Sequence, residues 1–171
     1  EEQQRKRKWN GILVTNPNCS TTVLTLPLKP IYDEFGIKSL IVSTMQAISG
    51  AGYPGVASMD IVDNVIPYIG GEEPKMESET QKILGTASEP ADFKVSSSCH
   101  RVPTIDGHME AVFVATKTKA EPKAVAEAME NFVGEPQTLK LPSAPEKPVI
   151  VTWEANRPQT RLDRMEGNGM S

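Results

Sequence analysis

Cys19 and His108 are residues of this sequence whose side chains could form a nucleophile and its base. Cys19 follows Asn16-Pro17-Asn18 and stands between a predicted buried strand and a predicted helix. Backbone N–H groups at a helix N-terminus stabilise an anion, so this position favours the nucleophilic thiolate. His108 follows a glycine turn and could act as the general base, because a cysteine–imidazole pair requires proximity in space alone. The alternative for Cys19 is a buried structural thiol.

Arg101 lies seven positions before His108, on the other side of the same turn. A guanidinium can bind a carboxylate through two hydrogen bonds, and a surface salt bridge explains the same residue equally well. A zinc site is not expected, because the spacings of the two cysteines and two histidines lack the short pairs of structural zinc motifs. The residues alone therefore leave a cysteine hydrolase and an acyl-thioester dehydrogenase open.

A glycine-rich segment, Ser49-Gly50-Ala51-Gly52-Tyr53-Pro54-Gly55, follows a predicted strand and matches G-x-G-x-x-G. A dinucleotide fingerprint should open a helix and lead to a second strand that ends in an acid. Pro54 interrupts the pattern and no clean βαβ unit follows, so we do not expect a Rossmann fingerprint. The glycines instead predict a loop whose backbone approaches a ligand closely.

Hydrophobic periodicity and breaker residues predict the elements that position these side chains. Strands are expected at residues 12–15, 38–46, 93–101, 108–116 and 148–153. Helices are expected over residues 1–9, 20–35, 57–65, 76–84 and 122–134. Pro27 and Pro30 should kink or split the second helix, and Asp106-Gly107 should turn a hairpin. These elements predict an α+β fold, with helices packed on a mixed, mostly antiparallel sheet.

The composition fits one domain with a core, since 38% of the 171 residues are hydrophobic. A formal charge of -4 implies no nucleic acid as partner, and the basic run Arg5-Lys6-Arg7-Lys8 is expected to be a solvated helix end. Two cysteines do not make a disulfide framework, and reduced thiols fit a cytoplasmic enzyme. No apolar stretch reaches transmembrane length. Because the sequence lacks an initiating Met, we expect a fragment of a larger protein.

Seven segments together resemble the catalytic domain of aspartate-semialdehyde dehydrogenase, and they run in family order through nearly the whole chain. They are residues 16–22, 43–55, 68–75, 79–85, 99–103, 106–110 and 167–171. Pro54 after Tyr53 and the closing Gly-Asn-Gly-Met-Ser are similar to the archaeal and fungal branch. The resemblance implies that residues 1–171 form a catalytic and dimerisation domain like that of glyceraldehyde-3-phosphate dehydrogenase. An N-terminal dinucleotide-binding domain would be absent from this chain.

The resemblance also implies catalytic and substrate-binding roles. Cys19 would be the nucleophile that carries the acyl thioester, and His108 would be the general base. Arg101 would clamp the substrate carboxylate, and Glu72 would contact the substrate amino group. Gln46 would place the substrate near the thioester. The reaction implied is the NADPH-dependent reduction of β-aspartyl phosphate to aspartate semialdehyde and phosphate, in the synthesis of threonine, methionine, isoleucine and lysine.

The remaining implied roles concern phosphate and the cofactor. Asn18 and Lys75 would bind phosphate. NADP, held mainly by the missing domain, would lie against Ser49 and Gly50, with Asn168 as a further contact; no metal is implied. The protein would be a homodimer or a dimer of dimers. The alternatives are a dimerisation module without activity of its own and a Cys/His hydrolase.

Overall fold

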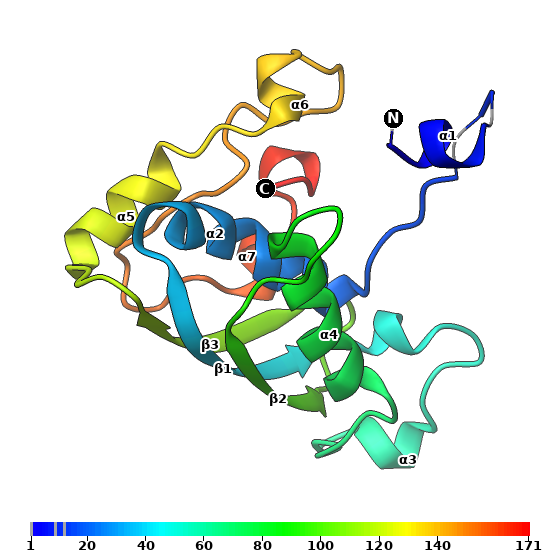
Figure 1. Cartoon of the computed structure of the whole chain (residues 1–171). Coiled ribbons are helices and arrows are strands. Elements are labelled where there is room, and N and C mark those ends of the chain that lie inside the picture. Colours follow the sequence, from blue (N-terminus) through cyan, green and yellow to red (C-terminus); the bar gives the residue numbers. More distant parts are fainter. Residues whose placement is uncertain (1, 9, 12) are drawn as a thin grey trace.

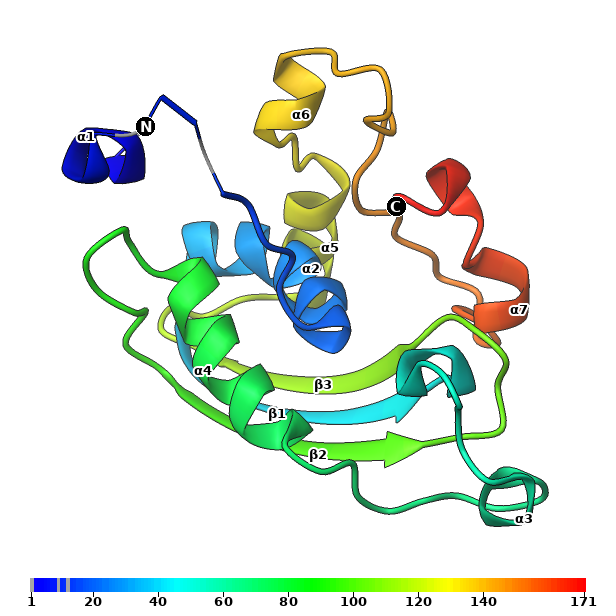
Figure 2. The ribbon, with the colours of Figure 1, turned by 90° about the vertical axis from the view of Figure 1, so that its right-hand side faces the viewer.

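The computed structural model describes residues 2–8, 10–11 and 13–171. Within them, three strands form one sheet, and the longer helices gather over one of its faces (Figure 1, Figure 2). No helix in this part of the chain has both the length and the apolar character that crossing a bilayer requires.

The middle strand of the sheet is β1 (Ile37–Gln46). It pairs in parallel with β2 (Lys94–Arg101) and antiparallel with β3 (Met109–Thr116). The sheet is therefore mixed, as predicted. However, the hairpin predicted through Asp106-Gly107 is wrong, because β1 separates the two strands that this turn connects. A turn signal reports on local geometry and cannot show that a third strand is inserted between its neighbours.

Figure 2 shows α2 (Cys19–Phe35), α4 (Glu72–Leu84) and α5 (Pro122–Glu130) above the sheet, with its other face bare of these helices. Buried apolar side chains from α2, α4, β1 and the residue just before β2 form the core between these layers. Among them are Leu24, Leu28, Ile31, Leu40, Val42, Met76, Leu84 and Phe93. In β1 the buried positions alternate up to Gln46, as the strand pattern predicts.

α2 is a single helix, with Pro27 and Pro30 inside it, so the predicted split is absent. The packing of its buried face against the core offsets the hydrogen bonds that the prolines cannot donate. Asn18 is the N-cap, and its Oδ1 accepts hydrogen bonds from the N–H groups of Ser20 and Thr21 at 3.0 and 3.2 Å. The helix ends at Gly36, as predicted.

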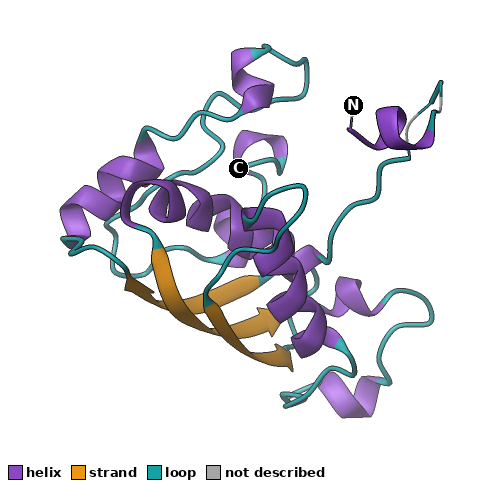
Figure 3. Ribbon diagram, viewed as in Figure 1, coloured by secondary structure: helices purple, strands orange, loops and turns teal. Residues whose placement is uncertain are grey.

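The shorter elements differ most from the predictions. They are α1 (Glu2–Arg7), η1 (Ile48–Ala51), α3 (Ser58–Ile61), α6 (Glu135–Thr138), α7 (Thr160–Asp163) and η2 (Glu166–Asn168). The strands predicted at 12–15 and 148–153 are wrong: residues 13–15 and 148–153 are loop (Figure 3), and Ile12 lies outside the described residues. Apolar runs extend into strands when a neighbouring strand is available, which the sequence does not reveal.

Carboxylates of α4 cover the outer edge of β2. Glu73 Oε1 accepts the backbone N–H of Cys99 at 3.2 Å, and Glu77 Oε1 accepts that of Ser97 at 3.1 Å. An uncovered strand edge offers such N–H groups to other chains, so these bonds protect the edge and fix α4 against the sheet.

Candidate active site

The sheet topology brings three predicted site residues to one end of the sheet. β1 and β2 run in parallel and finish together, so Gln46 lies opposite Arg101 in the register. β3 runs antiparallel and begins at this same end, directly after His108. The N-terminus of α2, with Cys19 in its first position, also lies here, since its thiol contacts His108.

Cys19 and His108 form a hydrogen-bonded pair, with 3.1 Å between Sγ and Nε2. The other ring nitrogen, Nδ1, accepts the backbone N–H of Ala47 at 3.1 Å. Since a backbone N–H can only donate, the neutral ring carries its proton on Nε2 and donates it toward the sulfur. Burial lowers the pKa of His108 below 6.5, and the positive charge of Arg101 lowers it further. The neutral imidazole is therefore the form that this site favours.

Arg101 is a buried cation next to this pair, with 6% of its surface exposed. Its Nη1 donates to the backbone oxygen of Ala47 at 2.8 Å, and it forms no ion pair within the described part of the chain. Gly50 lies against both groups: a Cβ there would be 2.9 Å from Arg101 Nη1 and 3.1 Å from His108 Cε1. The absence of a side chain at Gly50 keeps the space beside His108 open.

Glu72, at the start of α4, links several of the predicted ligand-binding residues. Its Oε2 accepts hydrogen bonds from Asn18 Nδ2 at 2.8 Å and from Gln46 Nε2 at 3.4 Å. Its Oε1 lies 3.7 Å from Lys75 Nζ, in an ion pair whose lysine is 57% exposed. One carboxylate therefore connects α2, β1 and α4 around the nucleophile.

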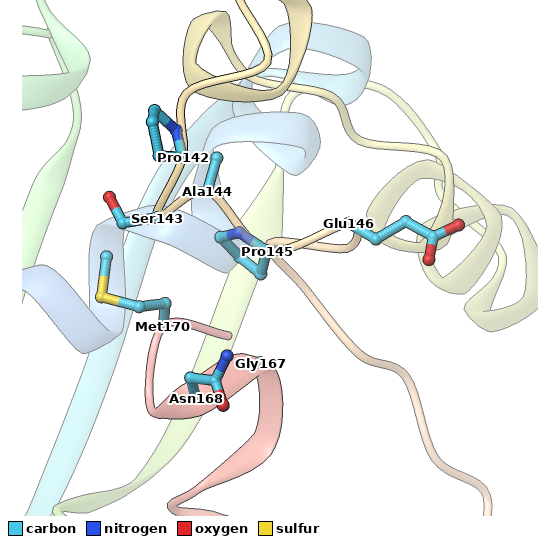
Figure 4. Close-up of a pocket in the computed structure, with 8 residues that line it drawn as sticks. All are labelled: Pro142, Ser143, Ala144, Pro145, Glu146, Gly167, Asn168 and Met170. Carbon is cyan, nitrogen blue, oxygen red and sulfur yellow. The ribbon is translucent and has the colours of Figure 1, made fainter.

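The residues predicted for the cofactor lie in two places. Ser49 adjoins Gly50, and its N–H donates to the backbone oxygen of Ile105 at 3.0 Å, which ties η1 to the loop before His108. Asn168 instead lines a pocket of about 430 Å³ that contains none of the other predicted site residues (Figure 4). The pocket walls are Pro142, Ser143, Ala144, Pro145, Glu146, Gly167, Asn168 and Met170. The cofactor contact of Asn168 stays a prediction.

The sequence analysis did not assign a role to Glu110, which lies two positions after His108 and opposite Thr44 in the register. Both carboxyl oxygens are buried without a hydrogen-bond partner within the described residues. Burial raises the pKa of Glu110 from 4.5 to about 8, so the carboxyl is mostly protonated at neutral pH. An acid on the same strand face as Val112 and Val114 is the sequence signal that could have identified it.

No cluster of three or more metal-ligating side chains occurs among residues 2–8, 10–11 and 13–171. The arrangement is instead suited to covalent chemistry at sulfur: an exposed thiol, a ring N–H directed at it, and a buried cation beside them.

Comparison with known proteins identifies the family. The family model for the semialdehyde dehydrogenase dimerisation domain matches residues 28–171. An aspartate-semialdehyde dehydrogenase of Methanothermobacter thermautotrophicus is 59% identical over 175 residues, which cover all of this chain and 50% of that protein. A malonyl CoA reductase (NADP) of Metallosphaera sedula is 45% identical over 179 residues, with the same two coverages.

A solved structure confirms the predicted fold. The crystal structure of aspartate semialdehyde dehydrogenase with NADP from Candida albicans has a TM-score of 0.83 and 38% identity to this chain. The match covers 98% of this chain and 50% of that one. The chain spans about half the length of the curated relatives it matches, and it belongs to the semialdehyde dehydrogenase family, of which it contains the dimerisation domain.

Proposed function

We propose that this chain is the catalytic and dimerisation half of an NADP-dependent aspartate-semialdehyde dehydrogenase. The complete enzyme reduces β-aspartyl phosphate to aspartate semialdehyde and phosphate through a thioester on Cys19. The observation that carries the proposal is the 3.1 Å contact between Cys19 Sγ and His108 Nε2, beside the buried cation of Arg101. Relatives that bear this enzyme's name also support the proposal, and this chain covers about half of each of them.

In this proposal Cys19 acts first. Its thiolate attacks the acyl carbon, an S–C bond forms, and phosphate leaves with the electron pair of the broken C–O bond. Bound NADPH supplies the hydride that reduces the thioester. The Nε2–H of His108 donates a hydrogen bond to the oxygen that becomes negative when the acyl carbon is tetrahedral. Cys19 then leaves as the thiolate, as the S–C bond breaks and the aldehyde forms.

This role for His108 differs from the general base that the sequence predicts. A base needs a free electron pair on Nε2, which in a neutral ring requires a proton on Nδ1. That proton would face the N–H of Ala47, whose hydrogen bond to Nδ1 would be lost. We therefore propose that His108 acts as a hydrogen-bond donor when Cys19 attacks.

The substrate is proposed to bind through side chains whose charges are opposite to those of the substrate groups. Arg101 donates hydrogen bonds to the substrate carboxylate, because its guanidinium is buried and forms no ion pair within the described residues. Glu72 binds the amino group, and Gln46, in contact with Glu72, places the substrate near Cys19. Lys75 and Asn18, which flank the same carboxylate, bind the phosphate.

The nicotinamide end of NADP is proposed to lie against Ser49 and Gly50, with Asn168 as a further contact. A flat group fits beside Gly50, where any side chain would collide with Arg101 and His108. The rest of the cofactor is proposed to be held by residues outside this chain.

The bare face of the sheet is proposed to form the homodimer interface. Ile41 and Phe113 lie opposite each other in the register and are 60% and 72% exposed. Large apolar side chains side by side on an uncovered sheet face mark an interaction site. We expect Phe113→Glu to convert the dimer to monomer in sedimentation velocity, whereas Ile83→Glu on α4 should leave it dimeric. If the protein is a dimer of dimers, Phe113→Glu should instead leave a dimer that is held together by a different interface.

A cytoplasmic location is also part of the proposal. Cys19 and Cys99 are both free thiols, which a reducing compartment preserves.

The test is an absorbance assay at the nicotinamide band on the full-length protein that contains this chain. Aspartate semialdehyde, phosphate and NADP should yield NADPH, and Cys19→Ala should abolish the signal. Malonyl-CoA with NADPH is the second arm, because one relative is named a malonyl CoA reductase. Turnover of malonyl-CoA alone, hydrolysis without cofactor, or no activity in any arm would each contradict the proposed reaction.

A further inference from the structure

The segment before Cys19 gives the nucleophile little support. Residues 13–17 form an exposed loop, in which Leu13 and Val14 are 73% and 79% exposed. The position of the thiol therefore depends on Asn18, the N-cap from which α2 begins.

Asn18 is held from α4 by two carboxylates. Its backbone N–H donates to Glu79 Oε2 at 2.7 Å, and its side-chain Nδ2 donates to Glu72 Oε2 at 2.8 Å. Glu72 and Glu79 are seven positions apart, about two helical turns, so both lie on the same face of α4. Glu72 already has a proposed role with substrate, whereas Glu79 has none.

We propose that Glu79 is a positioning residue for the nucleophile: its carboxylate holds the backbone of Asn18 so that Cys19 Sγ stays within hydrogen-bond distance of His108 Nε2. The bond is short, as expected when a carboxylate accepts from an N–H group. The residue it holds is the direct neighbour of Cys19, so a displacement at Asn18 moves the thiol. Misplacement of a reacting group by about 1 Å can lower the rate by about 100-fold.

The charge of Glu79 and its hydrogen bond act on Cys19 in opposite directions. A nearby carboxylate disfavours the thiolate, so removal of the charge alone should make Cys19 ionise at lower pH. Loss of the anchor separates Sγ from the His108 N–H that stabilises the thiolate, so Cys19 should ionise at higher pH. Glu79→Gln removes the charge and keeps an acceptor, whereas Glu79→Ala removes both.

The experiment measures alkylation of Cys19 by iodoacetamide against pH in the full-length protein, with the Cys19 peptide quantified by mass spectrometry. We expect the pH midpoint of alkylation to rise by about one pH unit in Glu79→Ala. It should stay equal or fall in Glu79→Gln. In a His108→Ala background, Glu79→Ala should cause no further rise, because the contact through which it acts is already absent.

Glu77→Ala is the matched control, because Glu77 lies on the same helix and also accepts a backbone N–H, that of Ser97 on β2. An equal rise in this control would mean that general loosening of α4 explains the result, and the proposal would be wrong. An unchanged midpoint in Glu79→Ala, or a further rise in the His108→Ala background, would also overturn it.

The inference rests on the proposed function, in which Cys19 is the nucleophile, but the alkylation test does not require turnover. If the midpoints shift as expected while the protein fails to act on aspartate semialdehyde, the positioning role stands and the assigned reaction fails. In an active enzyme, Glu79→Ala should lower kcat by about 10-fold or more. The KM for aspartate semialdehyde should change little, because Glu79 contacts none of its proposed ligands, whereas the KM for phosphate should rise, because Asn18 is a proposed phosphate ligand. Glu79→Gln should restore most of that loss.

Discussion

Replacement of Glu110 by Gln should change how the stability of the fold depends on pH. The pKa of this carboxyl is raised from 4.5 to about 8 by burial, so the folded chain binds its proton more tightly than the unfolded chain does. Between these two values the free energy of unfolding should fall by about 1.4 kcal/mol for each pH unit of increase. Over the interval from about pH 5 to about pH 8, ionisation of Glu110 should therefore remove about 3.5 kcal/mol of stability. That is a large share of the roughly 5–15 kcal/mol that stabilise an ordinary domain.

The assay is urea denaturation of the wild type and Glu110→Gln across this pH interval. Gln has the shape of the protonated acid and cannot ionise, so the difference in unfolding free energy between the two proteins should shift in favour of the variant as pH rises. Glu130→Gln, at an exposed position of α5, is the control and should give a difference that is constant with pH. If wild type and Glu110→Gln give parallel curves, Glu110 is not a buried neutral acid and the reasoning fails.

Three further predictions concern the site and its loop. Gly50→Ala should lower kcat/KM by about 10-fold or more, since its Cβ would collide with Arg101 and His108. The control is Gly70→Ala, whose Cβ would meet nothing within 4 Å and which should stay active. Equal steady-state rates for Gly50→Ala and the wild type would contradict this prediction. Gly52 has a φ of +66°, so Gly52→Val should cost about 1–2 kcal/mol, and an unchanged melting temperature would refute that strain. The pKa of His108 is lowered in the folded chain, so the unfolded chain binds a proton on this ring more readily. The stability that this difference contributes is present above pH 6.5 and is lost as pH falls through the folded-state pKa. In urea denaturation, His108→Asn should therefore lose less unfolding free energy than the wild type as the solution becomes acidic.

Local chemistry explains which parts of the fold could be predicted. The start of α2 after Asn18 and its end at Gly36 follow from a side-chain cap and a glycine with positive φ. The strand 38–46 was confirmed to within one residue, because its middle is apolar and β-branched, which favours a strand. The wrong hairpin and the wrong strand at 148–153 both concern pairing, which depends on segments distant in the sequence.

The candidate site divides in the same way. Cys19 and His108 are 89 positions apart, and residue chemistry was sufficient to predict that they belong together. The group that sets the tautomer of His108 is the backbone N–H of Ala47, and a backbone group leaves no signal in the residue type. Glu79 likewise acts on a backbone N–H, so the sequence showed it only as one of several acids on α4. The roles of the individual site residues stay predictions until the assays are made.

Glu110 and His108 bring two neutral titratable groups to one face of β3 and its approach, because they stand two positions apart along a strand. The carboxyl stays protonated because burial raises the pKa of Glu110 to about 8, and the ring stays neutral because burial and Arg101 lower the pKa of His108. Glu110→Gln keeps a neutral group of the same shape at this position, so it should leave the rate of Cys19 alkylation at neutral pH unchanged. A variant with a permanent charge, Glu110→Lys, should instead disrupt the fold, because an unpaired buried charge is costly. A changed alkylation rate in Glu110→Gln would show that the carboxyl is ionised in the folded protein, and the account of Glu110 as a neutral acid would fail.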